Sequence, residues 1–473
     1  MATVGTAQWS SRFAFIMAAV GSSVGLGNLW RFSAEAGDNG GGAFVLIYLM
    51  CIVFVGLPVL MSEFVIGRSG QAASAVYSMD DLSKRSKVST FWSSGAWLGM
   101  TASFLIVSFY CVVAAWVLAY IPKFLFGAFE GMSSEQISSV FSGSADVASG
   151  ALGCDPKVSE CKNVGLYFSP KQVFPWFVAF ALMTTFLVSR GVNKGIELAA
   201  KYLMPVFFLL LLSLAAFSLI TSWSSGGTKQ AFNYLFNPDF SAINGDIAIR
   251  ALGQACFSIG IGNAIMITYG SYLPRDVNIP KSSGLIVFTD TAVALIAGLA
   301  IFPIFFSTGL MESGVQPGGG IFFQALPNAL VQIPGGNMIG AAFFFLAFFA
   351  AITSSVSLLE PTVAWVADRF NMAKAKAAWT MGILMIALGS VSVMSGEVMD
   401  FIDETLTGSF IAPLSALVVV LFTGWRLDKK ILNEEIGAGG LGQFLMIFVK
   451  YLAPIFIGLV FVAKVYKVTI GAE

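Results

Sequence analysis

Residues 22–32, with the sequence SSVGLGNLWRF, interrupt the first hydrophobic segment of this chain. Together with Gly21 they place three glycines, two serines, Asn28 and Arg31 where a membrane helix is otherwise apolar. A Gly-rich face for helix packing would account for the glycines, but it leaves Asn28 and Arg31 unexplained. Irregular backbone at membrane depth survives only where protein buries it or where it lines a cavity. The stretch therefore predicts a helix that opens beside a cavity.

The composition indicates an integral membrane protein in a lipid bilayer. The chain has 473 residues, 57% hydrophobic and 11% charged, whereas soluble domains are about 25% charged. Zero net charge and the absence of histidine exclude a basic face for nucleic acid, a histidine metal site and a histidine proton relay. No nucleophile–base or metal-ligand cluster stands out, so we expect neither an enzyme nor an organic cofactor. Residues 1–11 lack a cleavable signal pattern, so the first span is expected to direct insertion.

Hydrophobic segments of about 20 residues are long enough to cross a bilayer. Eleven such spans are predicted within one domain, residues 1–473, at 12–36, 42–68, 90–125, 173–190, 197–222, 246–271, 283–310, 339–368, 377–396, 400–425 and 446–468. With the N-terminus inside, seventeen Lys and Arg residues fall on cytoplasmic segments and eight outside, while Arg31 lies in a span. Because cytoplasmic loops carry the excess of Lys and Arg, we expect a cytoplasmic N-terminus and an outside C-terminus.

The same topology places a long Ser/Gly-rich loop, residues 133–170, outside the cell. It contains Cys154 and Cys161, which we expect to form a local disulfide if that compartment is oxidising. The other three cysteines, Cys51, Cys111 and Cys256, fall in apolar segments and are expected to be small buried hydrophobic residues.

A second interruption, FSIGIGN at residues 257–263, lies inside the sixth span. Spans one and six thus each open a block of five spans. Two broken helices in corresponding halves are typical of inverted-repeat transporters, with the breaks at the midplane. We therefore predict an all-α membrane protein with an inverted 5+5 repeat, residues 12–222 and 246–425, followed by an extra helix at 446–468.

Several stretches carry a resemblance to a known family. They are GSSVGLGNLWRF at 21–32, NGGGAF at 39–44, GLP at 56–58, residues 63–68, GQACFS at 253–258, ALPN at 325–328, TSS at 353–355 and LLE at 358–360. With these the chain resembles a bacterial member of the neurotransmitter:sodium symporter family, which has the leucine-transporter-like fold. Ser33 departs from the usual proline. The resemblance implies a multi-pass transporter of the bacterial inner membrane that carries a neutral or polar amino acid into the cell with sodium, by alternating access.

The resemblance also implies two sodium sites. One would use the carbonyls of Gly21, Val24 and Ala350 with the hydroxyls of Thr353 and Ser354. The alternative for residues 353–355 is a helix whose hydroxyls bond to its own carbonyls. The other site would use the Ser23 carbonyl, the amide oxygen of Asn28, Ser258, Asp290 and the carboxylate of the bound amino acid. Sharing one ligand would couple the binding of sodium and substrate.

Asp290 lies about eight residues into the seventh span, where a charged group is costly and usually functional. Three residues match the anion site of chloride-dependent relatives, Tyr48, Gln254 and Ser258, but Ala294 stands where a serine is expected. We expect Asp290 to supply the missing negative charge and transport to be independent of chloride. Asp290 could exchange a proton on the return step or remain a permanent sodium ligand.

By the same resemblance the substrate carboxylate meets the Gly27 N–H and the Tyr110 hydroxyl, and its ammonium meets carbonyls near Ser23 and Phe257 and the Ser258 hydroxyl. Tyr110 and Phe257 would form an aromatic lid. The side-chain lining is expected from Ser22, Leu26, Ile106, Tyr110, Phe257, Ile259, Gly260, Asn263, Ser354 and Leu358. Ordinary core packing is the alternative for Ile106, Ile259 and Leu358.

Asn263 stands where relatives commonly have an aromatic or large apolar residue. A buried unpaired amide is costly, so Asn263 is expected to bond either a polar group of the substrate or only backbone and water. Gly260 adds room where many amino-acid transporters keep a serine.

Arg31 is expected to form an outer gate with an acid of span ten, with Asp403 preferred to Glu404 and Asp400. Trp9 and Tyr269 resemble elements of an inner gate.

Two other functional classes compete with symport. A passive channel also uses broken helices, but it would show a continuous polar stripe. A sodium-gated amino-acid sensor would bind without transport. The oligomeric state does not follow from the sequence.

Overall fold

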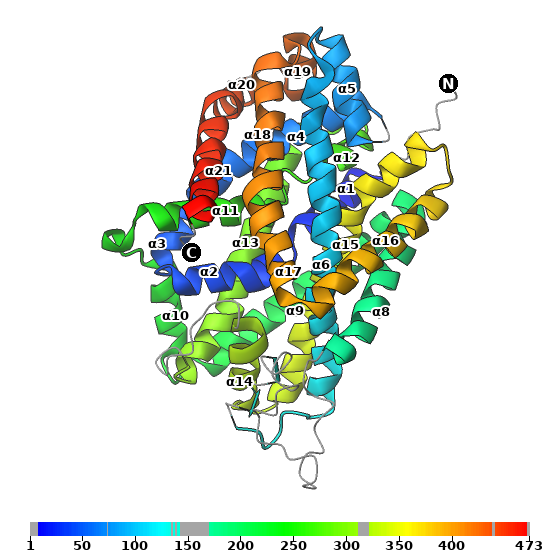
Figure 1. The fold of residues 1–473 in the computed structure, drawn as a ribbon. Coiled ribbons are helices and arrows are strands. Elements are labelled where there is room, and N and C mark those ends of the chain that lie inside the picture. The colour runs from blue at the N-terminus through cyan, green and yellow to red at the C-terminus, as the bar shows by residue number, and fades with distance from the viewer. Residues whose placement is uncertain are drawn as a thin grey trace.

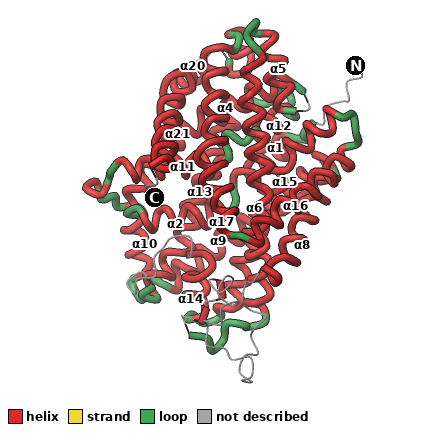
Figure 2. The backbone as a smooth tube through the Cα atoms, viewed as in Figure 1, coloured by secondary structure: helices red, strands yellow, loops and turns green. Residues whose placement is uncertain are grey.

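Helices make up all the regular secondary structure in the part of the chain that the structure describes (Figure 2). This computed structural model describes residues 8–72, 74–133, 136–137, 140–141, 170–310, 321–437 and 440–470. Cys154, Cys161 and their expected disulfide lie outside the described residues.

The elements run in the order shown in Figure 1. The α-helices are α1 Arg12–Ser23, α2 Phe32–Asp38, α3 Gly42–Cys51, α4 Leu57–Gly70, α5 Ala75–Arg85, α6 Ser94–Leu125, α8 Pro170–Ser189, α9 Glu197–Thr221, α10 Gly227–Phe236, α11 Gly245–Ile259, α12 Ile265–Ser271, α13 Ile279–Ser307, α14 Leu326–Val331, α15 Gly336–Arg369, α16 Lys374–Met394, α17 Gly396–Asp400, α18 Ala412–Leu421, α19 Lys429–Ile436, α20 Gly440–Ile447 and α21 Ala453–Ile470. Among the π-helical turns, η1 Gly27–Arg31 joins α1 to α2, and η8 Phe401–Ile411 joins α17 to α18.

Nine continuous helical stretches of the described chain are long and apolar enough to cross a membrane, and the bent pair Arg12–Ser23 and Gly27–Asp38 makes a tenth. The remaining predicted span, residues 246–271, is divided between α11 and α12, and neither part is long enough by itself. Eleven crossings therefore remain a prediction, as does the 5+5 repeat.

The first span is interrupted between α1 and η1. Its axis bends by 52°, and Val24 has an extended backbone (φ −73°, ψ 104°). The Gly25 N–H donates to the Asn28 side-chain oxygen at 3.0 Å, and the Asn28 N–H donates to the Gly25 carbonyl at 3.2 Å. Asn28 thus provides local hydrogen bonds for the Gly25 and Asn28 N–H groups, which in a continuous helix would bond to carbonyls one turn earlier.

The second interruption spans residues 260–264, between α11 and α12. Gly260 and Gly262 have positive φ values of 71° and 78°, which glycine adopts without a steric penalty. The Gly262 N–H donates to the buried carboxylate of Glu63 in α4 at 2.7 Å. A Cβ at Gly262 would lie 2.4 Å from the Ala412 carbonyl oxygen of α18. Glycine is therefore required here for both conformation and space.

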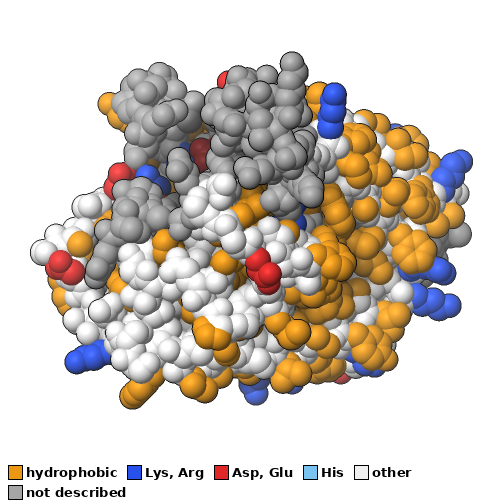
Figure 3. Space-filling view, turned by 90° about the horizontal axis from the view of Figure 1, so that it is seen from below, with side chains coloured by type: hydrophobic (Ala, Val, Ile, Leu, Met, Phe, Trp, Pro, Cys, Tyr) orange, Lys and Arg blue, Asp and Glu red, His pale blue; other side chains and the backbone are white. Residues whose placement is uncertain are grey.

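The two interrupted spans are enclosed by longer helices. In Figure 1 the cyan α6 and the yellow α15 lie beside one another, and these two helices share the most extensive contact of the bundle. Helix α1 packs against α9, α13 and α15. Large apolar side chains face outward, including Leu209 and Phe288, which are 67% and 70% exposed. Figure 3 shows hydrophobic side chains gathered over one side of the described surface, as expected of a surface that meets lipid.

Gly67 allows α4 and α12 to approach closely, because a Cβ there would lie 2.0 Å from the Ile267 carbonyl oxygen. We expect Gly67→Ala to lower the free energy of unfolding by about 1–3 kcal/mol through overpacking. The matched control is Gly284→Ala in α13, where a Cβ meets nothing within 4 Å. That change is expected to be neutral or stabilising by about 0.5–1 kcal/mol. Thermal unfolding in detergent measures both, and equal stability of the two variants would contradict the prediction.

Candidate functional site

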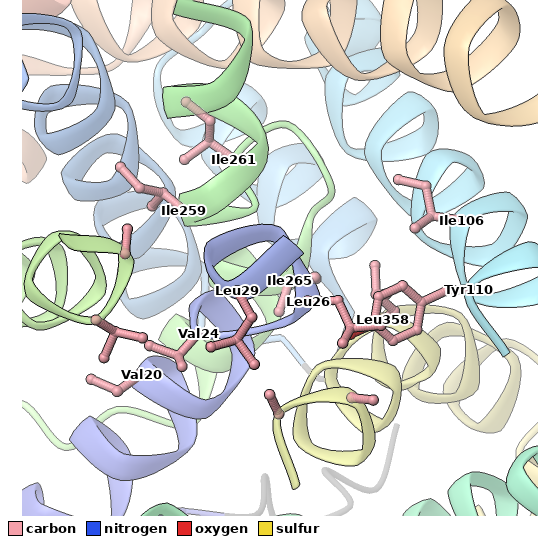
Figure 4. Packing of buried hydrophobic residues seen from close by; sticks show 14 of the residues in the cluster. Val20, Val24, Leu26, Leu29, Ile106, Tyr110, Ile259, Ile261, Ile265 and Leu358 are labelled. Carbon is pink, nitrogen blue, oxygen red and sulfur yellow. The ribbon is translucent and has the colours of Figure 1, made fainter. Parts of the chain in front are cut away.

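A cavity lies between the two interruptions, with α6 and α15 forming its opposite wall. Its empty space amounts to roughly 470 Å³, including space open to solvent, and we call it the central cavity. Its lining is Ser22, Ser23, Gly25, Leu26, Gly27, Ile106, Tyr110, Phe257, Ser258, Gly260, Asn263, Ile265, Ser354 and Leu358. In Figure 4, Leu26, Ile265, Tyr110 and Leu358 lie close together, and Ile106 lies farther along the helix α6 that also carries Tyr110.

Twelve of the thirteen residues expected at the substrate line the central cavity, and Ile259 is the exception. Its side chain is fully buried and packs against Gly56, directly before α4, where a Cβ would lie 2.4 Å from the Ile259 Cδ1. Ile259 thus takes the core-packing role that we considered as its alternative. Its carbonyl accepts a hydrogen bond from the Ser23 hydroxyl at 3.3 Å, which joins α1 to the end of α11.

Asp290 lies beside the two interrupted spans, fully buried in α13. Its carboxylate accepts hydrogen bonds from the Asn28 amide at 2.8 Å and from the Ser258 hydroxyl at 2.7 Å. The Tyr48 hydroxyl reaches the Ser258 oxygen at 3.4 Å. Two interrupted spans and α13 therefore meet at one carboxylate.

None of the ion pairs in the described part of the chain involves Asp290. Burial of an ionised carboxylate is costly unless a cation or several donors compensate for the lost water. The side chains of Asp290, Asn28 and Ser258 carry the carboxylate, amide and hydroxyl oxygens that suit a hard cation such as sodium. One detail differs from the expectation, because Asn28 turns its amide nitrogen, and not its oxygen, toward Asp290. For the Asn28 oxygen to coordinate a sodium ion at Asp290, the amide would have to turn over, because its oxygen here accepts from the Gly25 N–H and its nitrogen faces Asp290.

Ser354 in α15 meets a cluster of carbonyl oxygens at the end of α1. Its hydroxyl oxygen lies 3.4, 3.3 and 3.4 Å from the carbonyl oxygens of Gly21, Ser22 and Val24. One hydroxyl has one proton and can donate to only one of the three. The other two carbonyl oxygens receive no proton from Ser354, although they point to the same place. Oxygens that converge in this way could coordinate a cation.

Thr353, one residue earlier, behaves differently. Its hydroxyl donates to carbonyls of its own helix, Phe349 at 3.0 Å and Ala350 at 3.1 Å. Thr353 is nonetheless adjacent to α1, because a Cβ on Gly21 would lie 3.2 Å from the Thr353 Cβ. Thr353 and Ala350 are thus close to the cluster, but only Ser354 bonds to it directly.

Asn28 also determines which carbonyls are available to Ser354. In a continuous helix the Gly25 N–H would bond to the Gly21 carbonyl, and the Asn28 N–H to the Val24 carbonyl. Here both donors are used within the turn that Asn28 closes. The same residue therefore releases the Gly21 and Val24 carbonyls and contacts Asp290.

A second cavity adjoins the first, and the two share Ile106, Phe257 and Asn263. Its empty space amounts to roughly 680 Å³, including space open to solvent, and we call it the gate cavity because Arg31 and Asp403 line it. Asp400 and Glu404 do not line it, which favours Asp403 among the three acids. Arg31 pairs instead with Glu35 at 3.9 Å, and its guanidinium lies 4.5 Å from the centre of the Phe257 ring.

At the end of the site opposite the gate cavity, Trp9 lies just before the start of α1 and packs against Tyr269. Its indole N–H donates to the Tyr269 carbonyl at 3.1 Å, and its ring meets that of Tyr269 edge-on at 5.1 Å. Nearby, the Tyr272 hydroxyl donates to the buried Glu360 at 2.7 Å. The two residues expected at the inner gate are therefore in direct contact.

Gln254 and Ala294, which were considered for a chloride site, lie close to the contacts of Asp290 and Asn28. Gln254 donates to the Gly27 carbonyl at 3.0 Å, and Ala294 is fully buried four residues beyond Asp290 in α13. The Ala294 methyl group offers no hydrogen-bond donor for an anion, whereas the Asp290 carboxylate contacts Ser258.

Sequence reasoning missed several residues of the site. Gly25 and Ile265 line the central cavity, and Lys464 of α21 lines the gate cavity and donates to the Gly408 carbonyl at 2.9 Å. Glu63 and Ser103 hold the second interruption through Gly262 and Asn263. A buried glutamate in an apolar span was a signal for Glu63. Nothing in the sequence pointed to Ser103.

Comparisons with known proteins agree with one another. A family model described as "Sodium:neurotransmitter symporter family" matches residues 6–131 and 170–471. The Bacillus subtilis protein named "Uncharacterized sodium-dependent transporter YhdH" is 33% identical over 444 residues, which cover 91% of this chain and 90% of that protein. "Sodium-dependent nutrient amino acid transporter 1" of Drosophila virilis is 25% identical over 426 residues, which cover 82% and 65%. The crystal structure of MhsT in complex with L-phenylalanine matches with a TM-score of 0.82 and 35% identity, over 97% of this chain and 100% of that one.

The hydrogen bond from Gly262 to Glu63 gives a test of how the second interruption is held. We expect Glu63→Leu to leave the Gly262 N–H without an acceptor and to lower the free energy of unfolding by about 1–3 kcal/mol. Glu63→Gln retains a side-chain oxygen of similar reach and serves as the control. Thermal unfolding in detergent compares them, and a leucine variant as stable as the glutamine variant would refute the assigned role.

Proposed function

Because the chain belongs to the sodium:neurotransmitter symporter family, we propose that it takes up a neutral or polar amino acid, or a related zwitterion, together with sodium. Membership confirms the family expected from the sequence and a sodium-dependent multi-pass membrane transporter, not an enzyme. The match to MhsT confirms the all-helical, leucine-transporter-like fold. The substrate, the ion count, the orientation and the inner-membrane location are parts of the proposal.

The observation that carries the proposal is the Ser354 cluster. Three main-chain carbonyl oxygens lie within 3.4 Å of one hydroxyl at the point where α1 ends. Carbonyl and hydroxyl oxygens can replace the hydration shell of sodium. A sodium ion bound by Gly21, Val24 and Ser354, with Ala350 and Thr353 adjacent, would fix the first span against α15.

We expect a second sodium ion near Asp290, whose carboxylate contacts Asn28 and Ser258. The Ser23 carbonyl would be a further ligand beside the central cavity. An amino-acid carboxylate placed between the Gly27 N–H and the Tyr110 hydroxyl would complete its coordination. Since each bound partner then supplies a ligand for the other, the binding of sodium and amino acid would be coupled, reciprocally and by the same factor.

Alternation would use the two ends of the site. The gate cavity holds Arg31 and Asp403 unpaired with one another, while Trp9 and Tyr269 are in contact at the other end. We infer that occupation of the central cavity draws Arg31 toward Asp403 and closes Phe257 and Tyr110 over the substrate. Release then requires Trp9 to leave Tyr269.

Sodium-driven uptake tests the function directly. The intact protein in proteoliposomes should accumulate a radiolabelled amino acid when sodium is imposed outside, and potassium should not replace sodium. Leakage of amino acid that neither saturates nor depends on a gradient would indicate a channel. Binding that needs sodium but gives no accumulation would indicate a sensor.

Ser354→Ala removes the hydroxyl at the carbonyl cluster. We expect the sodium concentration for half-maximal uptake to rise about tenfold or more, which corresponds to about 1.4 kcal/mol of lost binding. The matched control is Ser390→Ala in α16, whose hydroxyl bonds only to the Ile386 carbonyl. An unchanged sodium dependence of the Ser354 variant would exclude the cluster as an ion site.

Asp290 is expected to make transport independent of chloride. Replacement of chloride by gluconate should leave uptake by the wild type unchanged, because the carboxylate supplies the negative charge beside sodium. The same replacement should reduce uptake by Asp290→Asn, which is isosteric and neutral. Failure of the wild type in gluconate would end this assignment.

A further inference from the structure

Asn263 is a buried amide in the wall between the two cavities. It lies in the second interruption, lines both cavities and is 8% exposed. Its main-chain carbonyl accepts a hydrogen bond from the Ser103 hydroxyl of α6, so its backbone is held in place. Its side-chain oxygen is buried and has no hydrogen-bond partner. Buried polar atoms are nearly always paired in proteins, and this one belongs to a residue that borders both cavities.

Two other polar side chains of the central cavity, Ser22 and Tyr110, also have buried hydroxyls without a partner, and the Tyr110 hydroxyl is assigned above to the substrate carboxylate. The hydroxyls of Ser23, Ser258 and Ser354 bond to the Ala19 carbonyl, to Asp290 and to the α1 carbonyls. These serines line the central cavity alone, whereas Asn263 also borders the gate cavity with Ile106 and Phe257. Asn263 therefore lies apart from the ion-binding groups, where the side chain of a bound amino acid would extend.

We propose that Asn263 binds the side chain of the transported amino acid, and that this side chain is uncharged and carries an N–H or O–H donor. The inference rests on the amino-acid transport proposed above. A hydrocarbon side chain would leave the Asn263 oxygen unpaired. An ionised side chain held within the central cavity would be buried without a counter-ion, because no charged side chain lines that cavity, and Arg31, Asp403 and Lys464 line only the gate cavity. An amide on the substrate could bond twice, since the Asn263 nitrogen is also a donor.

A hydrogen-bonding wall discriminates in a characteristic way. A site built to pair with a substrate O–H or N–H rejects the analogue that lacks it far more strongly than an apolar pocket rejects a change of one methylene group. Pairs of amino acids of similar size therefore separate this proposal from simple selection by volume. Suitable pairs are threonine and valine, asparagine and leucine, and tryptophan and 2-naphthylalanine.

The experiment measures competition by each pair against sodium-driven uptake in proteoliposomes of the full chain. In the pair that competes best, we expect the polar member to be preferred by about tenfold or more. Asn263→Leu should abolish or reverse that preference, because leucine has a similar volume and no polar atom. The matched control, Asn337→Leu, lies at the start of α15, bonds to Glu130 and lines neither cavity. It should retain the preference of the wild type.

Two failures are distinguishable. Sodium-driven uptake in which the apolar member competes as well as the polar one would overturn the role of Asn263 and leave the proposed function standing. Absence of sodium-driven uptake for all amino acids of the panel would overturn the proposed function itself. The comparison within each pair uses the wild type, so the proposal stays testable even if Asn263→Leu does not fold.

Discussion

The structure depends on one constraint, that every main-chain amide at membrane depth needs a partner. A continuous helix satisfies this constraint automatically, and an interrupted one must find substitutes. In the first span Asn28 provides them, because its side chain and its own N–H close the turn around Gly25. In the second, Glu63 accepts from Gly262 and Ser103 donates to Asn263. The interruptions are therefore stable without the main-chain hydrogen bonds of a continuous helix.

The same pairing gives the site its chemistry. Once the turn at Gly25 is closed, the carbonyls of Gly21 and Val24 lose their helical donors and face Ser354. Asn28 reaches Asp290 on its other side. A change in the Asn28 amide, such as the rotation that its oxygen would need to coordinate a sodium ion at Asp290, would alter the turn and with it the carbonyls at Ser354. The two proposed ion positions are thus linked through one residue, which gives a physical route for coupling.

Much of this could be anticipated from the sequence, because the informative residues break a strong rule. Glycines, Asn28 and Arg31 in an apolar span, and Asp290 in another, are conspicuous against lipid-compatible sequence. Residues whose role depends on three-dimensional proximity were less accessible. Ile259 has the same character as Ile106, yet it packs beside Gly56 and not in the cavity. Arg31 pairs with Glu35, four residues away, in this arrangement of the gate. Lys464 lies near the C-terminal end of the sequence, and the hydrophobic periodicity of the chain cannot reveal that it lines the gate cavity.

The central claim is that carbonyls released by the interruptions bind sodium beside the amino acid. Its most direct test is the affinity of the purified protein for an amino acid, measured as sodium replaces potassium at constant ionic strength. We expect the affinity for the amino acid to rise with sodium, and the amino acid to strengthen sodium binding by the same factor. An amino-acid affinity that is the same in sodium and in potassium would contradict it.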